Sequence, residues 1–253
     1  MMAKIRNIAS TQHVATSLDE LKISYDQLYG EEWLGEHRND VQVKLMVDLV
    51  KAGPGLFLDV ACGLGFAIQV AEERGAKGVG LDLSYVALKK SKLPNPDLRI
   101  VQGNGEDLPW PNDTFDYVIC TGSLEHFIHP ELGMQEISRV LKNTGRTAIL
   151  LPNSHNLLAI YNVYKTGGIL PERQDFERFA TRLEWQSLLE SNGLNVESVH
   201  KFNVGFARVF KKGRELFWYP YNILYRTLGD WWIPLNMSYN LVFVCRKQQL
   251  AQQ

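Results

Sequence analysis

The sequence has few cysteines, no excess of either charge and no long apolar run. Its 253 residues include three cysteines, Cys62, Cys120 and Cys245, which lie far apart and form no CxxC spacing. This pattern indicates neither a disulfide framework nor a cysteine zinc site, and it favours a reducing compartment. Lys and Arg number 27 against 28 Asp and Glu, so the basic surplus that binding to a nucleic-acid backbone requires is missing.

Signals for membranes and secretion are also missing. No stretch approaches the roughly 18 uninterrupted apolar residues of a membrane-spanning helix, and no apolar segment follows the basic N-terminus as in a signal peptide. We therefore expect a cytoplasmic protein with no nucleic-acid partner and no transmembrane segment. The length fits one large domain, or one domain with a substantial insertion.

Short apolar runs alternate with helical patterns through the middle of the sequence, which is typical of a parallel sheet flanked by helices. The run LFLDV at residues 56–60 leads into a glycine loop and indicates a fully buried strand. Ser84 is a suitable N-cap for a helix that Pro94 and Pro96 bring to an end. We predict strands at residues 56–60, 77–82, 98–103, 115–122 and 146–152, and helices at 64–74, 84–92 and 130–141.

The alternation stops after Pro152. Residues 155–178 show no clean period and contain Gly167, Gly168 and Pro171, which predicts an irregular excursion. An amphipathic helix at 181–191 and strands at 194–202 and 239–247 follow, and a long aromatic segment at about 205–238 separates these two strands.

The glycine loop is the strongest chemical signal. It begins at Asp59, contains Gly63 and Gly65, and lies between a buried strand and a helix, where an open α/β sheet binds its ligands. Glycine lets the backbone approach a ligand closely. Asp82 ends the second strand, about twenty residues downstream, where a carboxylate can accept both hydroxyls of a ribose. A tight turn would explain the glycines alone, and an exposed acidic residue would explain Asp82 alone. Neither explains why both features occur together at the ends of successive strands.

The details of the loop favour one nucleotide-like ligand. A dinucleotide-binding loop has a third glycine where this sequence has Ile68, and no P-loop pattern is present. A carboxylate at Asp59 would repel a pyrophosphate but suits a ligand that carries an ammonium and a sulfonium. That ligand is S-adenosylmethionine.

Several blocks of the sequence resemble the class I S-adenosylmethionine-dependent methyltransferases, in particular their small-molecule branch. LDVACGLG, GLDLS and GNGEDLPWPNDTFDYVICTGSLEHF follow one another as the motifs of that family do, over about residues 56–153. The resemblance implies an α/β fold with a Rossmann-like, seven-stranded, mostly parallel sheet, an antiparallel edge hairpin from the last two strands, and helices on both faces. Ala61 stands where the family usually has glycine, and Asn104-Gly105 where it commonly has Asp-Ala.

The resemblance also implies a set of cofactor-binding residues. Asp59 and the backbone of the loop would face the methionine part, Asp82 the ribose and Leu83 the adenine. Cys120 and Thr121 would line the site at the end of the fourth strand. The full set implied for the domain is Asp59, Ala61, Gly63, Gly65, Asp82, Leu83, Asn104, Gly105, Glu106, Cys120 and Thr121.

The segment YDQLYGEEWLGEHR resembles an N-terminal cap of the same family. Tyr25 and Trp33 would cover the sulfonium, and Arg38 would pair with the cofactor carboxylate. A packed amphipathic helix explains the pattern equally well. We predict a helical cap at residues 1–50 and a methyltransferase domain at 51–253, with insertions at about 155–178 and 205–238.

Glu125, His126 and His129 form a small polar cluster after the fourth strand. A metal site would need at least one more ligand, and the sequence indicates none, so we predict no metal. His126 is a candidate general base, because histidine titrates near neutral pH and the loop abuts the transferable methyl in this fold. A loop-orienting histidine is the alternative, and His155 has the same two interpretations.

The segment at 205–238 combines aromatic with basic residues. This composition fits a lid that packs on the sheet and lines an acceptor pocket, or a helix at a membrane surface. We favour the lid, and peripheral membrane contact is the alternative. The aromatic residues in question are Trp218, Tyr219, Tyr221, Trp231 and Trp232, and the basic ones are Arg208, Lys211, Lys212, Arg214 and Arg226.

These features predict an enzyme that transfers a methyl group from S-adenosylmethionine to an O, N or C nucleophile of a small molecule, glycan- or lipid-linked acceptors included. S-Adenosylhomocysteine would be the product. The first alternative is a non-catalytic S-adenosylmethionine-binding regulatory or scaffold protein, because binding residues survive in both cases. A nicotinamide oxidoreductase is disfavoured by the missing third glycine.

Overall fold

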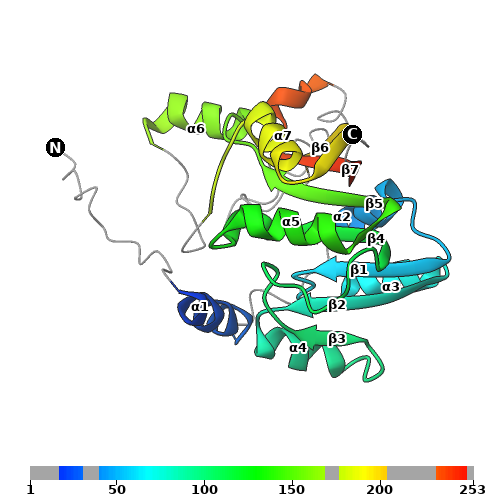
Figure 1. Ribbon diagram of the computed structural model, residues 1–253. Coiled ribbons are helices and arrows are strands. Elements are labelled where there is room, and N and C mark those ends of the chain that lie inside the picture. Colours follow the sequence, from blue (N-terminus) through cyan, green and yellow to red (C-terminus); the bar gives the residue numbers. More distant parts are fainter. Residues whose placement is uncertain (1–16, 31–39, 169–176, 204–231, 250–253) are drawn as a thin grey trace.

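A seven-stranded sheet forms the centre of the molecule in the computed structural model, which describes residues 17–30, 40–168, 177–203 and 232–249 (Figure 1). The strand order is β3-β2-β1-β4-β5-β7-β6. Strands β1 to β5 pair in parallel, whereas β7 runs antiparallel to both β5 and β6. The predicted Rossmann-like fold with an antiparallel edge is confirmed. The strands are β1 Gly55–Val60, β2 Ala76–Asp82, β3 Ile100–Gln102, β4 Phe115–Thr121, β5 Leu141–Pro152, β6 Leu194–Phe202 and β7 Asn240–Lys247.

Helices cover both faces of this sheet. They are α1 Leu18–Gly30, α2 Asp40–Leu49, α3 Phe66–Glu73, α4 Tyr85–Lys92, α5 Pro130–Val140, α6 Leu157–Thr166 and α7 Arg182–Ser191, with short 3-10 turns η1 Leu124–His126 and η3 Leu235–Met237. One buried cluster joins α5 and α7 to the sheet, and a second joins α2 and α3 to its other face. Both faces of the central strands are therefore apolar, which explains the continuous run at residues 56–60.

Local capping signals fix where several helices begin. Ser84 accepts a hydrogen bond from the Ala87 N–H at the start of α4, as predicted. Thr181 and Glu184 form a reciprocal capping box at the start of α7. Residue Gly65 precedes α3 in a left-handed conformation, with φ of 71°.

The prediction of an irregular excursion at 155–178 is wrong for its first part. Helix α6 occupies Leu157–Thr166, with Asn156 as its N-cap and Gly167 at its end. Ile160 and Val163 are exposed on this helix while Leu158, two and five positions before them, is buried. Apolar residues thus lie on both sides of α6, so the sequence shows no amphipathic period although a helix is present.

The segment at 205–238 lies mostly outside the described residues. Residues 204–231 are not described, and Trp218, Tyr219, Tyr221 and Trp231 fall among them, so the lid and the membrane contact both stay predictions. In the described part of the chain, no helix has the length and apolar character needed to cross a membrane. The predicted cap at 1–50 is described only in α1 and α2, and Met46 and Val47 of α2 are fully buried in the second cluster.

The two faces of α7 provide a matched test of the packing. Leu189 is fully buried in the first cluster, whereas Leu183 on the same helix is 65% exposed. We expect Leu189→Ala to lower the free energy of unfolding by about 2 to 5 kcal/mol, because it leaves a cavity. Leu183→Ala should change it by less than about 0.5 kcal/mol. Urea unfolding followed by circular dichroism measures both, and equal losses would contradict the packing described here.

Candidate active site

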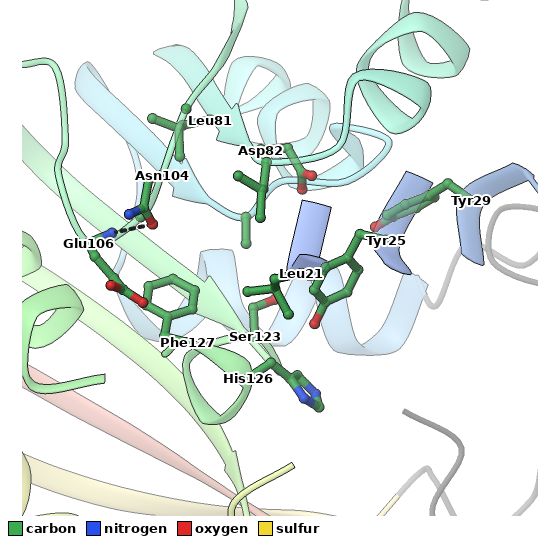
Figure 2. A pocket seen from close by; sticks show the side chains of 14 residues that line it. Leu21, Tyr25, Tyr29, Leu81, Asp82, Asn104, Glu106, Ser123, His126 and Phe127 are labelled. Carbon is green, nitrogen blue, oxygen red and sulfur yellow. Dashed lines mark hydrogen bonds between the residues drawn. The ribbon is translucent and has the colours of Figure 1, made fainter. Parts of the chain in front are cut away.

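A pocket lies at the carboxyl ends of β1, β2 and β3, with α1 on its open side (Figure 2). It encloses about 520 Å³, including the part open to solvent. Among the residues that line it, no Lys or Arg occurs, and Asp82 and Glu106 are the carboxylates. The lining residues are Leu21, Tyr25, Tyr29, Ala61, Leu81, Asp82, Leu83, Gly103, Asn104, Gly105, Glu106, Ser123, His126 and Phe127.

The glycine loop forms one wall of this pocket through an unusual backbone. Ala61, Gly63 and Gly65 all have positive φ, at 59°, 51° and 71°. A side chain at Gly63 is impossible without rearrangement, because its Cβ would lie 2.5 Å from the Oη atom of Tyr29. Ala61 holds a left-handed conformation that non-glycine residues seldom adopt, and such strain is concentrated at functional sites.

Asp82 connects this loop to the next helix. The Gly63 N–H donates to Asp82 Oδ2 (2.7 Å), and the Ser84 N–H donates to Asp82 Oδ1 (2.8 Å). Burial raises the pKa of Asp82, and these hydrogen bonds counteract part of the rise. The carboxylate therefore fixes the loop and also faces the pocket.

The residues that follow β3 form a second wall of the pocket. Asn104 Oδ1 accepts from the Glu106 N–H (3.0 Å) (Figure 2). Glu106 Oε1 accepts from the His129 N–H (3.1 Å). At Gly105 an added Cβ would lie 2.4 Å from Phe127 Cζ, so glycine here allows the Phe127 ring to close the pocket. Phe127 was not among the predicted residues.

Helix α1 covers the pocket with Leu21, Tyr25 and Tyr29, whose side chains lie on one face of the helix. Its position is fixed by α4, beside which it lies (Figure 1). Asp26 Oδ1 accepts from the Ser84 Oγ hydroxyl (2.6 Å) and from the Val86 N–H (3.1 Å), at the N-terminus of α4. Lys90 Nζ donates to the Tyr29 carbonyl oxygen.

The predicted residues divide into three groups. Seven of the cofactor-binding residues line the pocket: Tyr25, Ala61, Asp82, Leu83, Asn104, Gly105 and Glu106. Five others, Asp59, Gly63, Gly65, Cys120 and Thr121, lie outside its lining; Trp33 and Arg38 lie outside the described residues. Burial and the neighbouring Asp82 raise the pKa of Asp59. Sequence reasoning missed Leu21 and Tyr29, although their four-residue spacing from Tyr25 was a usable helical signal.

At the end of β4, Glu125 and His126 are both buried. Their nearest charged atoms, Glu125 Oε1 and His126 Nε2, are 3.9 Å apart, and the Tyr25 ring meets the imidazole edge-on. Burial raises the pKa of Glu125 to about 8, and the charge of Glu177 adds to the rise. His126 lines the pocket, whereas His129 and His155 do not.

The raised pKa of Glu125 makes stability depend on pH. The folded protein keeps a proton that the unfolded chain releases, so the contribution of Glu125 to stability is complete below pH 4.5 and is lost as pH rises towards about 8. Glu125→Gln has no such proton to lose. We therefore expect the unfolding free energy of Glu125→Gln, relative to that of the wild type, to rise by roughly 1 kcal/mol per pH unit between pH 4.5 and about 8. EDTA in the buffer removes stray cations that could bind the carboxylate. Urea unfolding at pH 5 to 8 measures this, with the exposed Glu131→Gln as control. Parallel wild-type and Glu125→Gln curves would contradict it.

Comparisons with known proteins identify the family. The profile of a family described as "Methyltransferase domain" matches residues 58–149. A demethylmenaquinone methyltransferase of Lysinibacillus sphaericus is 32% identical, over 60% of this chain and 70% of its own length. The chloroplastic 2-methyl-6-phytyl-1,4-hydroquinone methyltransferase of Spinacia oleracea is 34% identical over 52% of this chain, and the match spans only 39% of the spinach protein.

Solved structures show the same fold. The geranyl diphosphate C-methyltransferase of Streptomyces coelicolor A3(2), solved with Mg²⁺, geranyl diphosphate and S-adenosyl-L-homocysteine, superposes with a TM-score of 0.59. The match covers 87% of this chain and 86% of that one, at 15% sequence identity.

Proposed function

This chain belongs to the class I S-adenosylmethionine-dependent methyltransferases, and from that premise we propose that it transfers a methyl group from S-adenosylmethionine to a nucleophilic atom of a small molecule. The observation that carries the proposal is the pocket itself. It joins the glycine loop to Asp82, and no Lys or Arg lines it among the described residues. An acidic pocket of this kind complements a ligand that carries a sulfonium and an ammonium.

The pocket residues suggest how the cofactor is held. Each carboxylate oxygen of Asp82 already accepts one hydrogen bond and has a further lone pair, so both can accept a ribose hydroxyl. Leu83 and Phe127 offer apolar surface for the adenine, and Asn104, Gly105 and Glu106 meet its edge. The loop at Ala61, Gly63 and Gly65, with Asp59, Cys120 and Thr121 behind it, faces the methionine part. Trp33 and Arg38 would complete the cover together with Tyr25.

Alignment and exclusion of water are the main contributions of the protein to this reaction. S-Adenosylmethionine supplies an electrophilic methyl group bound to sulfur. Tyr25 and Tyr29 close the pocket from α1, so the acceptor must approach along a restricted path. His126 lies at the pocket wall beside Tyr25, and we propose that it promotes removal of a proton from an acceptor hydroxyl.

The names of the relatives narrow the range of acceptor molecules. The names of the spinach and Lysinibacillus proteins describe methylation of a hydroquinone and of demethylmenaquinone. We propose an aromatic small molecule of the hydroquinone class as the acceptor of this chain. A cytoplasmic location is part of the proposal, because Cys62, Cys120 and Cys245 are all free and buried.

Transfer of a labelled methyl group tests the function. The full chain would be incubated with methyl-labelled S-adenosylmethionine and a panel of hydroquinones, phenols and amines, and labelled products would be quantified. We expect turnover with at least one hydroquinone. Tight cofactor binding without transfer to any acceptor would favour the non-catalytic binding protein instead.

Replacing Asp82 tests the ribose contact. Asp82→Ala should weaken S-adenosylmethionine binding at least tenfold, because each charge-assisted hydrogen bond contributes roughly 1.5 to 3 kcal/mol. Calorimetric titration measures the affinity, and circular dichroism checks that the overall fold is retained. Asp97→Ala, at an exposed aspartate, is the matched control. Unchanged affinity in Asp82→Ala would show that the carboxylate does not bind the cofactor.

Replacing His126 tests its proposed role in removing a proton from the acceptor. His126→Ala should lower kcat on the order of a hundredfold with little change in cofactor affinity, since a group that assists proton transfer contributes about that much. His129→Ala, outside the pocket, should retain near wild-type turnover. A loss below tenfold that does not vary with pH would leave His126 with a structural role only.

A further inference from the structure

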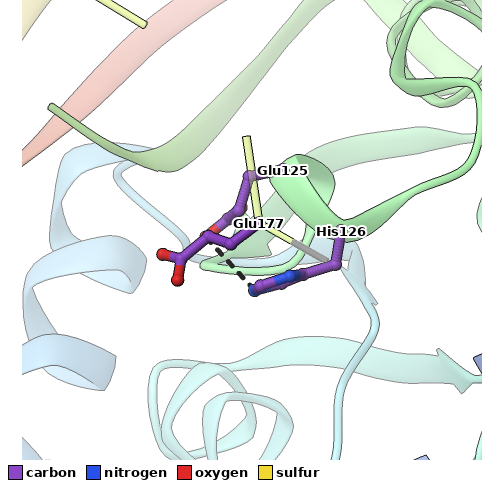
Figure 3. Close-up of side chains that lie close together, drawn as sticks. All are labelled: Glu125, His126 and Glu177. Atoms are coloured by element: carbon purple, nitrogen blue, oxygen red, sulfur yellow. Dashed lines mark ion pairs between the residues drawn. The ribbon is translucent and has the colours of Figure 1, made fainter. Parts of the chain in front are cut away.

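Three potential metal ligands converge beside the pocket. Glu125 and His126 belong to η1, and Glu177 comes from a segment about fifty residues later in the chain (Figure 3). One ligand atom from each lies within 4.8 Å of the other two. The sequence indicated no further ligand for the cluster of Glu125, His126 and His129, because Glu177 approaches Glu125 and His126 only in the folded chain.

The carboxylate of Glu125 provides an independent observation. Glu125 is only 4% exposed, and among the described residues its Oε2 atom has no hydrogen-bond partner. Its Oε1 atom lies 3.9 Å from His126 Nε2, which is longer than a hydrogen bond. Buried carboxylate oxygens are normally hydrogen-bonded or bound to a cation, so the Oε2 atom of Glu125 lacks the partner that such an atom usually has.

Arg178 holds the third ligand close to the other two. Its backbone N–H donates to the Glu125 carbonyl oxygen (3.2 Å), and its guanidinium donates to the carbonyl oxygens of Glu125, Phe127 and Ile128. The segment that carries Glu177 is thus attached to the loop that carries Glu125 and His126. This arrangement gives the three side chains a fixed framework.

We propose that Glu125, His126 and Glu177 bind a divalent transition-metal ion such as Mn²⁺ or Zn²⁺. An imidazole combined with two carboxylates is a ligand set for such ions, which leaves coordination positions open. Ligand atoms that share a tetrahedral ion with bonds of about 2.1 Å lie roughly 3.4 Å apart. The three ligand atoms lie within 4.8 Å of one another, so side-chain rotations that move each atom by about 1 Å would bring all three into coordination.

The cation would act on the acceptor, a consequence that rests on the proposed function. Since His126 also lines the pocket, an open coordination position can face an acceptor hydroxyl and make its proton more acidic. The proton leaves to solvent, a bond forms between that oxygen and the methyl carbon, and the carbon–sulfur bond breaks. His126 then promotes proton loss as a metal ligand, in place of the general base predicted from the sequence.

Titration with the metal alone tests the site. The full chain would be treated with EDTA, dialysed, and titrated with MnCl₂ while electron paramagnetic resonance follows free Mn²⁺; calorimetry with ZnCl₂ gives a second measurement. We expect one saturable site per chain. Glu125→Gln and Glu177→Gln should each weaken the affinity at least tenfold. Glu131→Gln, at an exposed glutamate near His129, should bind as wild type does.

Absence of saturable binding, or binding that both glutamine variants retain, would overturn the proposal. Glu177 is only partly buried, so Glu177→Gln keeps the test valid if Glu125→Gln does not fold. Metal binding and methyl transfer are scored separately. Methyl transfer by a protein that binds no metal would refute this inference and leave the proposed function intact. Metal binding without methyl transfer to any acceptor would refute the proposed function and leave the metal site intact.

Discussion

The carboxylate of Asp82 is the interaction on which the rest of the site depends. It accepts one backbone hydrogen bond from the glycine loop at Gly63 and another from Ser84 at the start of α4. Ser84 in turn donates to Asp26 of α1. One short series of hydrogen bonds therefore joins the glycine loop, the start of α4 and helix α1, so a change at Asp82 affects all three.

Uncompensated negative charge is the second common feature of the site. Asp59, Asp82 and Glu125 are all buried, and burial raises the pKa of each. Buried carboxylates lower the stability of a protein without ligand unless a proton or a cation neutralises them. A sulfonium at one end of the pocket and a metal ion at the other would each supply positive charge where the folded chain provides little.

Most of the fold could be predicted from the sequence, because short apolar runs, such as residues 56–60 before the glycine loop, alternate with helical patterns. The pocket wall that follows the strands was also predictable, since the ends of parallel strands meet at one edge. Helix α6 was missed because its apolar residues lie on both sides. Glu177 and Phe127 were missed because their contacts with the site depend on packing between distant segments, which no local pattern records.

Two glycines of the site are each matched to an aromatic ring from another element. Tyr29 occupies the space that a Cβ at Gly63 would need, and Phe127 occupies the space at Gly105. Neither position can accept a larger residue while its partner ring stays in place. During evolutionary divergence, each glycine and its ring should therefore change together, and homologues that cover the cofactor differently should show paired replacements at these positions.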